Sequence, residues 1–153
     1  MKAINLFMAF TIAVISFTSC ATSKAVASYN ANNISKYSYV VFGDNSSGDR
    51  GLDDVMMAVQ NEIAQTKLQV VSSRDGVSKI ANGEYVLSPN IHIKTEEWGG
   101  GHTYITITFY DYDTNQSVVV LKSSAIGLTI SHDQNIAIKA IRKELRKVFG
   151  KQF

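Results

Sequence analysis

Two stretches of the chain alternate apolar and polar side chains, and they constrain the possible folds more than any other feature. In residues 85–94 and again in residues 104–110, every second residue is large and apolar or is proline. A period of two places one set of side chains on each face of a β-strand. We therefore predict two long strands, and we expect Ile105, Ile107 and Phe109 to point into the core.

Three further segments predict additional strands. The polar run 111–116 is typical of a hairpin turn, so residues 117–128 are expected to return as a strand beside residues 104–110. Segments 36–42 and 68–71 are short and rich in aromatic or β-branched residues, which also favours strands.

Two segments, 51–67 and 131–149, have the 3.6-residue periodicity of amphipathic helices. Ser131 and Gln134 match a capping box at the start of the second helix, and Gly150 is a typical stop. The expected buried stripes are Leu52, Val55, Met56, Val59 and Ile63 in the first helix, and Ala137, Ile138, Ile141, Leu145, Val148 and Phe149 in the second.

The resulting order, β-α-β-β-β-β-α, predicts an α+β fold built as a two-layer sandwich. Two helices would cover one face of a four- to five-stranded, mostly antiparallel mixed sheet. A formal net charge of +2 over 153 residues gives no argument for nucleic acid as a partner. The chain has one cysteine, so no disulfide forms within it and the core alone must hold the fold.

The first twenty residues predict export. Lys2 precedes an uncharged run, residues 3–17, which is too short to span a bilayer, and small and polar residues follow it. The sole cysteine, Cys20, stands where a bacterial lipoprotein is cleaved and acylated. We predict a lipoprotein signal peptide over residues 1–19 and lipidation, including palmitate, at Cys20. The alternative is ordinary secretion with cleavage after Ala21.

Small and polar residues without sustained periodicity occupy residues 20–35, which predicts a flexible tether. Residues 36–153 would then form a single domain. Acidic residues are absent directly after Cys20, which favours a periplasm-facing protein of the outer membrane over one on the cell surface.

Two segments carry a resemblance to a known group of proteins. They are Gly83-Glu84-Tyr85-Val86-Leu87 at the start of a long strand and residues 108–120 around the hairpin. The chain resembles small α/β domains of Gram-negative lipoproteins, including penicillin-binding-protein activators and the curli secretion lipoprotein. The resemblance implies a non-enzymatic periplasmic domain that binds another envelope component.

The outward row of the strand 104–110 is a candidate surface for partner binding. It consists of Tyr104, Thr106, Thr108 and Tyr110, with Trp98 as a possible rim residue. Exposed aromatic rings on a sheet bind sugars or protein partners. The alternative is that tyrosine and threonine are simply good strand formers.

A second candidate surface is basic and lies on the last helix, where Lys139, Arg142, Lys143 and Arg146 recur on one side. These cations would suit an acidic partner or lipid phosphates. The alternative is that they complement the helix dipole and solvate the exposed face.

Signals for metal or cofactor binding are incomplete. Asp111, Asp113 and Asn115 copy the first three ligands of a calcium loop, but Gln116 and Lys122 replace the glycine and the bidentate glutamate. We therefore expect a polar turn, with no metal and no other cofactor.

No complete catalytic set is present, so we do not expect an enzyme. The carboxylates Glu96, Glu97 and Asp111 with His102 would have to converge in one cleft to support a small cell-wall or glycan hydrolase, the alternative function. We expect instead a membrane-anchored binding or scaffold module whose partner is an envelope protein or a cell-wall component. A subunit of a secretion or pilus assembly is a further alternative.

Overall fold

The computed structural model describes residues 22–29, 31–43, 52–96 and 101–152. The predicted signal peptide, Cys20, Glu97 and Trp98 lie outside these residues.

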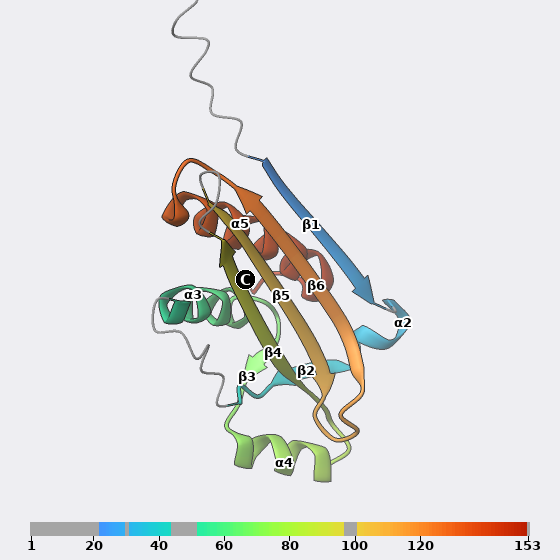
Figure 1. Ribbon diagram of the computed structural model, residues 1–153. Helices are drawn as coiled ribbons and strands as arrows, with labels where there is room; N and C mark the ends of the chain where they lie inside the picture. Colours follow the sequence, from blue (N-terminus) through green and yellow to red (C-terminus); the bar gives the residue numbers. More distant parts are fainter. Residues whose placement is uncertain (1–21, 30, 44–51, 97–100, 153) are drawn as a thin grey trace, which may run out of the picture.

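One mixed sheet forms the centre of the fold (Figure 1). Its strands are β1 (Thr22–Tyr29), β2 (Tyr37–Val40), β3 (Gln69–Val70), β4 (Tyr85–Glu96), β5 (His102–Asp111) and β6 (Ser117–Ile126). Their order across the sheet is β1-β6-β5-β4-β2-β3. Neighbours are antiparallel from β1 to β4, whereas β2 pairs parallel with both β4 and β3.

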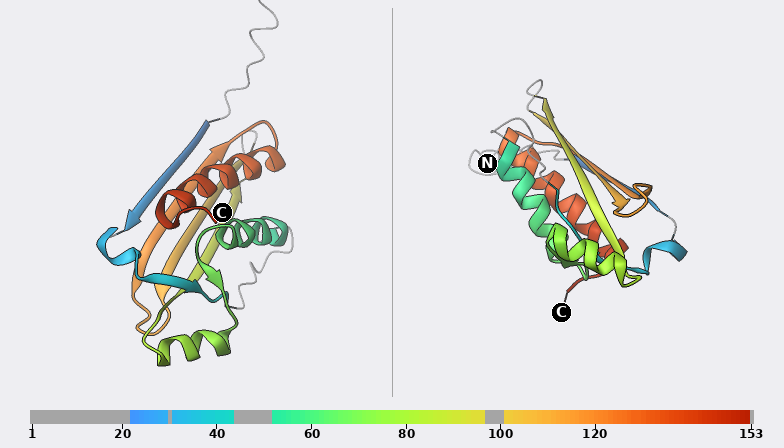
Figure 2. Two further views of the ribbon diagram at one scale, coloured as in Figure 1. Left: turned by 180° about the vertical axis from the view of Figure 1, so that it is seen from behind. Right: turned by 90° about the horizontal axis from the view of Figure 1, so that it is seen from below.

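The helices are α2 (Ala31–Ile34), α3 (Asp53–Ala64), α4 (Ser73–Ala81) and α5 (Ile130–Phe149). Figure 2 shows α3 and α5 side by side on one face of the sheet, with the opposite face uncovered. The predicted α+β sandwich is therefore confirmed. The described sheet has six strands instead of four or five, because β1 joins it.

The flexible tether predicted for residues 20–35 is wrong for most of its length. Strand β1 pairs with β6 over eight positions, from Thr22↔Ile126 to Tyr29↔Val119. Without β1, the backbone groups of β6 that face away from β5 would lack these partners. Ala27, a small residue of this strand, packs against the core. Because β1 consists mainly of small and polar residues, its sequence has no hydrophobic alternation from which a strand could be predicted.

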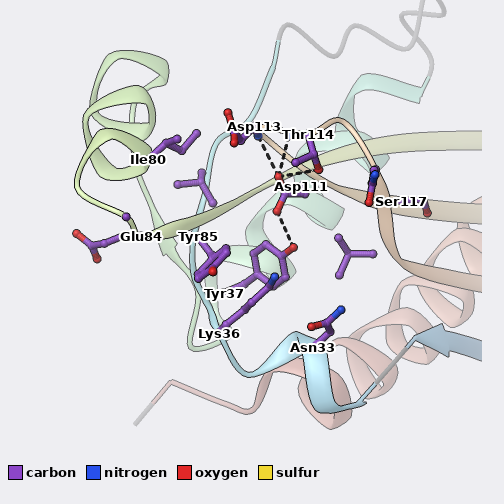
Figure 3. Close-up of a pocket in the computed structure, with 14 residues that line it drawn as sticks. Asn33, Lys36, Tyr37, Ile80, Glu84, Tyr85, Asp111, Asp113, Thr114 and Ser117 are labelled. Carbon is purple, nitrogen blue, oxygen red and sulfur yellow. Dashed lines mark hydrogen bonds between the residues drawn. The ribbon is translucent and has the colours of Figure 1, made fainter.

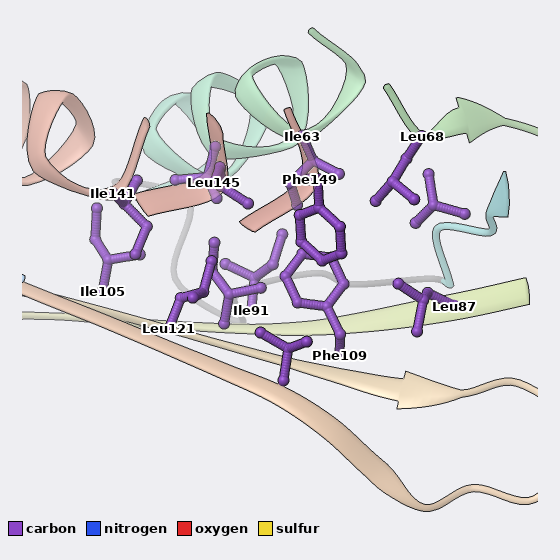
Figure 4. Packing of buried hydrophobic residues seen from close by; sticks show 14 of the residues in the cluster. Ile63, Leu68, Leu87, Ile91, Ile105, Phe109, Leu121, Ile141, Leu145 and Phe149 are labelled. Atoms are coloured by element: carbon purple, nitrogen blue, oxygen red, sulfur yellow. The ribbon is translucent and has the colours of Figure 1, made fainter. Parts of the chain in front are cut away.

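The core lies between the sheet and the two long helices (Figure 4). Ile105, Ile107 and Phe109 are all 0% exposed, as the alternation predicts. The rings of Phe109 and Phe149 meet edge to face with centroids 4.9 Å apart, which joins β5 to the end of α5. The buried stripe of α3 consists of Val55, Met56, Val59 and Ile63, together with the polar Glu62.

The start of α5 differs from the predicted capping box. Thr129 is the N-cap, and its side-chain oxygen accepts a hydrogen bond from the backbone N–H of His132. The helix thus begins at Ile130, one residue before the predicted start, and Ser131 lies in its first turn. Gly150 ends the helix at a φ of 78°, a left-handed conformation that favours glycine, as predicted.

Candidate functional site

The uncovered face of the sheet carries the predicted row on β5. Tyr104, Thr106, Thr108 and Tyr110 are half-buried, while the residues between them point into the core. Because α3 and α5 cover only the other face, this row lies on the open face (Figure 2). The row reaches about 20 Å along the strand, at roughly 3.3 Å per residue.

The strands beside β5 extend this row into a polar surface. Residues directly opposite each other in an antiparallel pair share a face of the sheet. Thr106 therefore lies between His92 of β4 and Lys122 of β6, and Tyr104 lies between Lys94 and Ser124. We call these residues, with Thr108 and Tyr110, the open sheet face.

The charges on the open sheet face are mostly positive. Lys94 forms an ion pair with Glu96 at 2.6 Å, and this hydrogen bond holds the pKa of Glu96 below its usual value. Lys122 is exposed and forms no ion pair with any residue that the structure describes. The open sheet face thus presents Lys122, a lysine without an ion-pair partner among the described residues, beside the β5 row at the level of Thr106.

One end of the open sheet face contains a preformed aromatic contact. The rings of His102 and Tyr104 stack with centroids 4.4 Å apart. The Tyr104 hydroxyl lies 3.0 Å from Nδ1 of His102, within hydrogen-bond distance. This contact holds the Tyr104 side chain in place beside Lys94.

A cavity of about 410 Å³ lies at the opposite end of the strands, and of its lining the sequence analysis had considered only Asp111 and Asp113 (Figure 3). The start of β2, the start of β4 and the β5–β6 hairpin line it. Lys36 lies over the ring of Tyr85 at 4.1 Å, and Tyr37 contacts the same ring edge to face. These residues come from distant segments, so no local motif marks them.

Asp111 organises the wall of this cavity. Its Oδ2 accepts a hydrogen bond of 2.7 Å from the Tyr37 hydroxyl. Its Oδ1 accepts from the backbone N–H groups of Asp113 and Thr114 and from the Thr114 hydroxyl. The predicted polar turn is therefore built on Asp111, whose carboxylate oxygens face backbone and hydroxyl donors.

The pKa values of this pair move in opposite directions. Burial acts to raise the pKa of Asp111, but hydrogen bonds from Thr114, Tyr37 and Asp113 outweigh it and bring the pKa below the usual 3.8. Burial, followed by the hydrogen bond to Asp111, raises the pKa of the Tyr37 hydroxyl well above the usual 10.0. The pair therefore favours an ionised carboxylate beside a neutral phenol.

We expect Tyr37→Phe to lower the free energy of unfolding by about 1–2 kcal/mol at neutral pH, because it removes a buried hydrogen bond to a charged group. The contribution of Asp111 is full above its unfolded pKa and is lost as pH falls through the lower folded value. The contribution of Tyr37 is full below pH 10.0 and is lost as pH rises toward its higher folded pKa.

Urea unfolding at a series of pH values measures this difference, with Tyr85→Phe as the control for an exposed tyrosine in the same cavity. If the difference in free energy of unfolding between wild type and Tyr37→Phe were the same at acid, neutral and alkaline pH, this result would contradict the assigned hydrogen bond.

The four basic residues predicted as a surface on the last helix differ in their exposure and in the groups that they contact. Lys139 and Lys143 are exposed, whereas Arg142 makes a bidentate pair with Glu62 of α3. Nε of Arg146 is buried and has no hydrogen-bond partner among the described residues. Arg142 is therefore engaged between the two helices, and only the two lysines are fully available to a partner.

The residues proposed for a hydrolase are not brought together. Glu96 and His102 lie opposite each other at one end of β4 and β5, whereas Asp111 lies at the other end of β5. A general acid needs a raised carboxylate pKa, but the pKa of Glu96 is lowered. Glu97 lies outside the described residues.

In the described part of the chain, no group of three or more histidine, cysteine, aspartate or glutamate side chains is placed to hold a metal ion. None of the helices described is both long and apolar enough to cross a membrane.

Comparison with known proteins identifies a shared fold. No protein-family profile and no curated protein sequence matches the chain. Among solved structures it is similar to PelC from Paraburkholderia phytofirmans, described as a dodecamer, with a TM-score of 0.51 and 15% identity over 86% of this chain and 100% of that one. A dodecamer of a point variant of the same protein aligns with a TM-score of 0.49 and 17% identity over 86% and 99% of the two chains.

Proposed function

We propose that the protein is a lipid-anchored, non-enzymatic binding module of the cell envelope, and that its open sheet face binds an acidic polysaccharide. The observation that carries the proposal is the placement of both long helices on one face of the sheet. The other face is left with tyrosine rings, threonine hydroxyls and the uncompensated Lys122.

The chemistry of this face favours a polysaccharide over an acidic peptide. Tyr104 and Tyr110 offer apolar rings for packing against sugar rings, and Thr106 and Thr108 offer hydroxyls between them. An extended peptide would instead add a strand to a sheet edge, using unpaired backbone groups. Strand β5 is interior, since both β4 and β6 pair with it, and so it offers no such edge.

We expect Lys122→Glu to weaken binding of an acidic oligosaccharide, such as an oligouronate, by about fivefold or more. The substitution removes one surface attraction and adds one repulsion, each worth up to about 1 kcal/mol. Isothermal titration calorimetry measures the affinity, which should also fall with added salt. The matched control is Lys139→Glu, because Lys139 is an exposed lysine on α5.

Equal affinity of wild type for the oligouronate and for uncharged dextran would contradict charge recognition. An equal loss of affinity in Lys122→Glu and Lys139→Glu would contradict the assignment of the binding site to the open sheet face.

The anchor has its own test. We expect a radioactive fatty acid supplied to growing cells to label the protein, and Cys20→Ala to abolish the label, because the acyl groups are attached at that cysteine. A wild-type protein that carries no label, or a Cys20→Ala variant that keeps it, would contradict lipidation at this residue.

A second candidate function is that of a subunit in an assembly made of several copies. The observation that favours it is the fold shared with PelC, which is described as a dodecamer. Light scattering on the detergent-solubilised protein measures the mass of the complex. A mass equal to one chain at all concentrations would exclude this candidate without affecting polysaccharide binding.

A further inference from the structure

An exposed apolar stretch follows strand β6. Ile126 ends β6 and is 40% exposed, Leu128 is 71% exposed, and Ile130, which opens α5, is 37% exposed. Leu128 is the most exposed large hydrophobic residue that the structure describes. We call these three residues the apolar tip.

The apolar tip lies at the end of the molecule where the N-terminal segment enters the fold. Thr22, the first residue of β1, pairs directly with Ile126. Figure 1 shows the start of β1, the end of β6 and the connection to α5 together at this end. The β5–β6 hairpin and α4 lie at the opposite end (Figure 1), and residues of this hairpin line the cavity.

Only one residue separates Cys20 from Thr22, the first residue of β1, which pairs with the apolar tip. Two residues of chain reach at most about 7 Å, and directly paired strand residues have Cα atoms about 5 Å apart. The Cα atom of Cys20 is therefore at most about 12 Å from that of Ile126, and acyl groups on Cys20 would enter the bilayer close to the apolar tip. Because β1 replaces the expected long tether, the folded domain is held close to the membrane.

The segment that carries the apolar tip has little negative charge, and the nearby Glu96, two strands from Ile126, is paired with Lys94. Between Ile126 and Asn135 the only carboxylate is Asp133, which is 0% exposed. His132 and Ser131 are exposed and complete the polar part of the turn. Exposed aliphatic side chains next to neutral polar side chains suit a segment that lies at a bilayer interface.

We propose that the apolar tip inserts into the interfacial layer of the membrane that holds the lipid anchor. The occupant of this surface is thus the bilayer itself, and the proposal rests on lipidation of Cys20. The insertion gives the domain a second attachment point beside the acyl groups. It directs the strands away from the membrane, with the hairpin and the cavity at the far end.

The test uses full-length acylated protein in vesicles of phosphatidylethanolamine and phosphatidylglycerol. An environment-sensitive fluorophore is attached in the variant Leu128→Cys, where an acylated Cys20 has no free thiol to react. The matched control is Val77→Cys, because Val77 lies on α4 at the opposite end and is also exposed, at 59%.

We expect a blue-shifted emission at position 128, several-fold weaker quenching by aqueous iodide than at position 77, and quenching by nitroxide-labelled lipids. Vesicle flotation and intact mass report the anchor in the same sample. A protein that floats while position 128 is as open to iodide as position 77 overturns the proposal and leaves the anchor standing.

Two other outcomes also overturn it. A position 128 that is shielded from iodide but not quenched by nitroxide lipids is covered by a protein, either a second copy or an envelope partner. Loss of flotation with an unmodified Cys20 overturns the anchor and the insertion together.

Discussion

Phe109→Ala should lower the free energy of unfolding by about 3–5 kcal/mol, the range for removing a large buried aromatic side chain. Phe109 is 0% exposed and its ring meets that of Phe149 at 4.9 Å, so the substitution leaves a cavity between β5 and α5. Urea unfolding followed by circular dichroism measures the loss. Because the free energy of unfolding of a small domain is only about 5–15 kcal/mol, the substitution would remove a large share of the stability.

Tyr110→Ala is the matched control for this prediction. It removes a ring of similar size from the next position of β5, but on the open sheet face. We expect a loss of about 1 kcal/mol, typical of a half-exposed strand position. Equal losses in the two variants would mean that the assignment of faces on β5 is wrong.

Arg142→Ala should destabilise the fold by about 2–3 kcal/mol, because it leaves the Glu62 carboxylate buried without its partner. The two side chains join α3 to α5 through two hydrogen bonds, one of them 2.7 Å long. The Glu62 side chain is only 7% exposed. The Arg142 side chain is 38% exposed, so water offsets part of the loss and the effect stays below that of a fully buried pair.

Lys143→Ala is the control for this second prediction. Lys143 is the exposed neighbour of Arg142 in α5, and its replacement should change the free energy of unfolding by no more than about 0.5 kcal/mol. Replacing Glu62 and Arg142 together by leucine should recover most of the loss, because no buried charge is left unpaired. A double variant that is less stable than Arg142→Ala would contradict this account of the pair.

The fold of residues 36–149 was accessible from the sequence because its elements have strong periodic patterns. Ile105, Ile107 and Phe109 alternate with polar residues, and only one register buries all three. Strand β1 lacks that signal, since it consists mainly of small and polar residues. Its pairing is decided by the open edge of β6, which is a property of the tertiary structure.

The candidate sites also differ in how far the sequence could predict them. The open sheet face follows from the alternation on β5, and so its row of four residues was predicted correctly as outward-facing. The cavity depends on contacts such as Tyr37 with Asp111, which are 74 positions apart. Arg142 and Glu62 are 80 positions apart, and for this reason the sequence assigned Arg142 to a surface patch. The spacing of residues along one helix does not show which side chains of a neighbouring helix will pair with them.

Mapping the bound ligand onto the protein tests the central claim most directly. Amide chemical shifts of the isotope-labelled protein are recorded while an acidic oligosaccharide is added. We predict that the largest shifts cluster on β5 between Tyr104 and Tyr110 and around Lys122. Shifts confined to α5, or none at concentrations that saturate calorimetric binding, would contradict the assignment of the open sheet face as the binding surface.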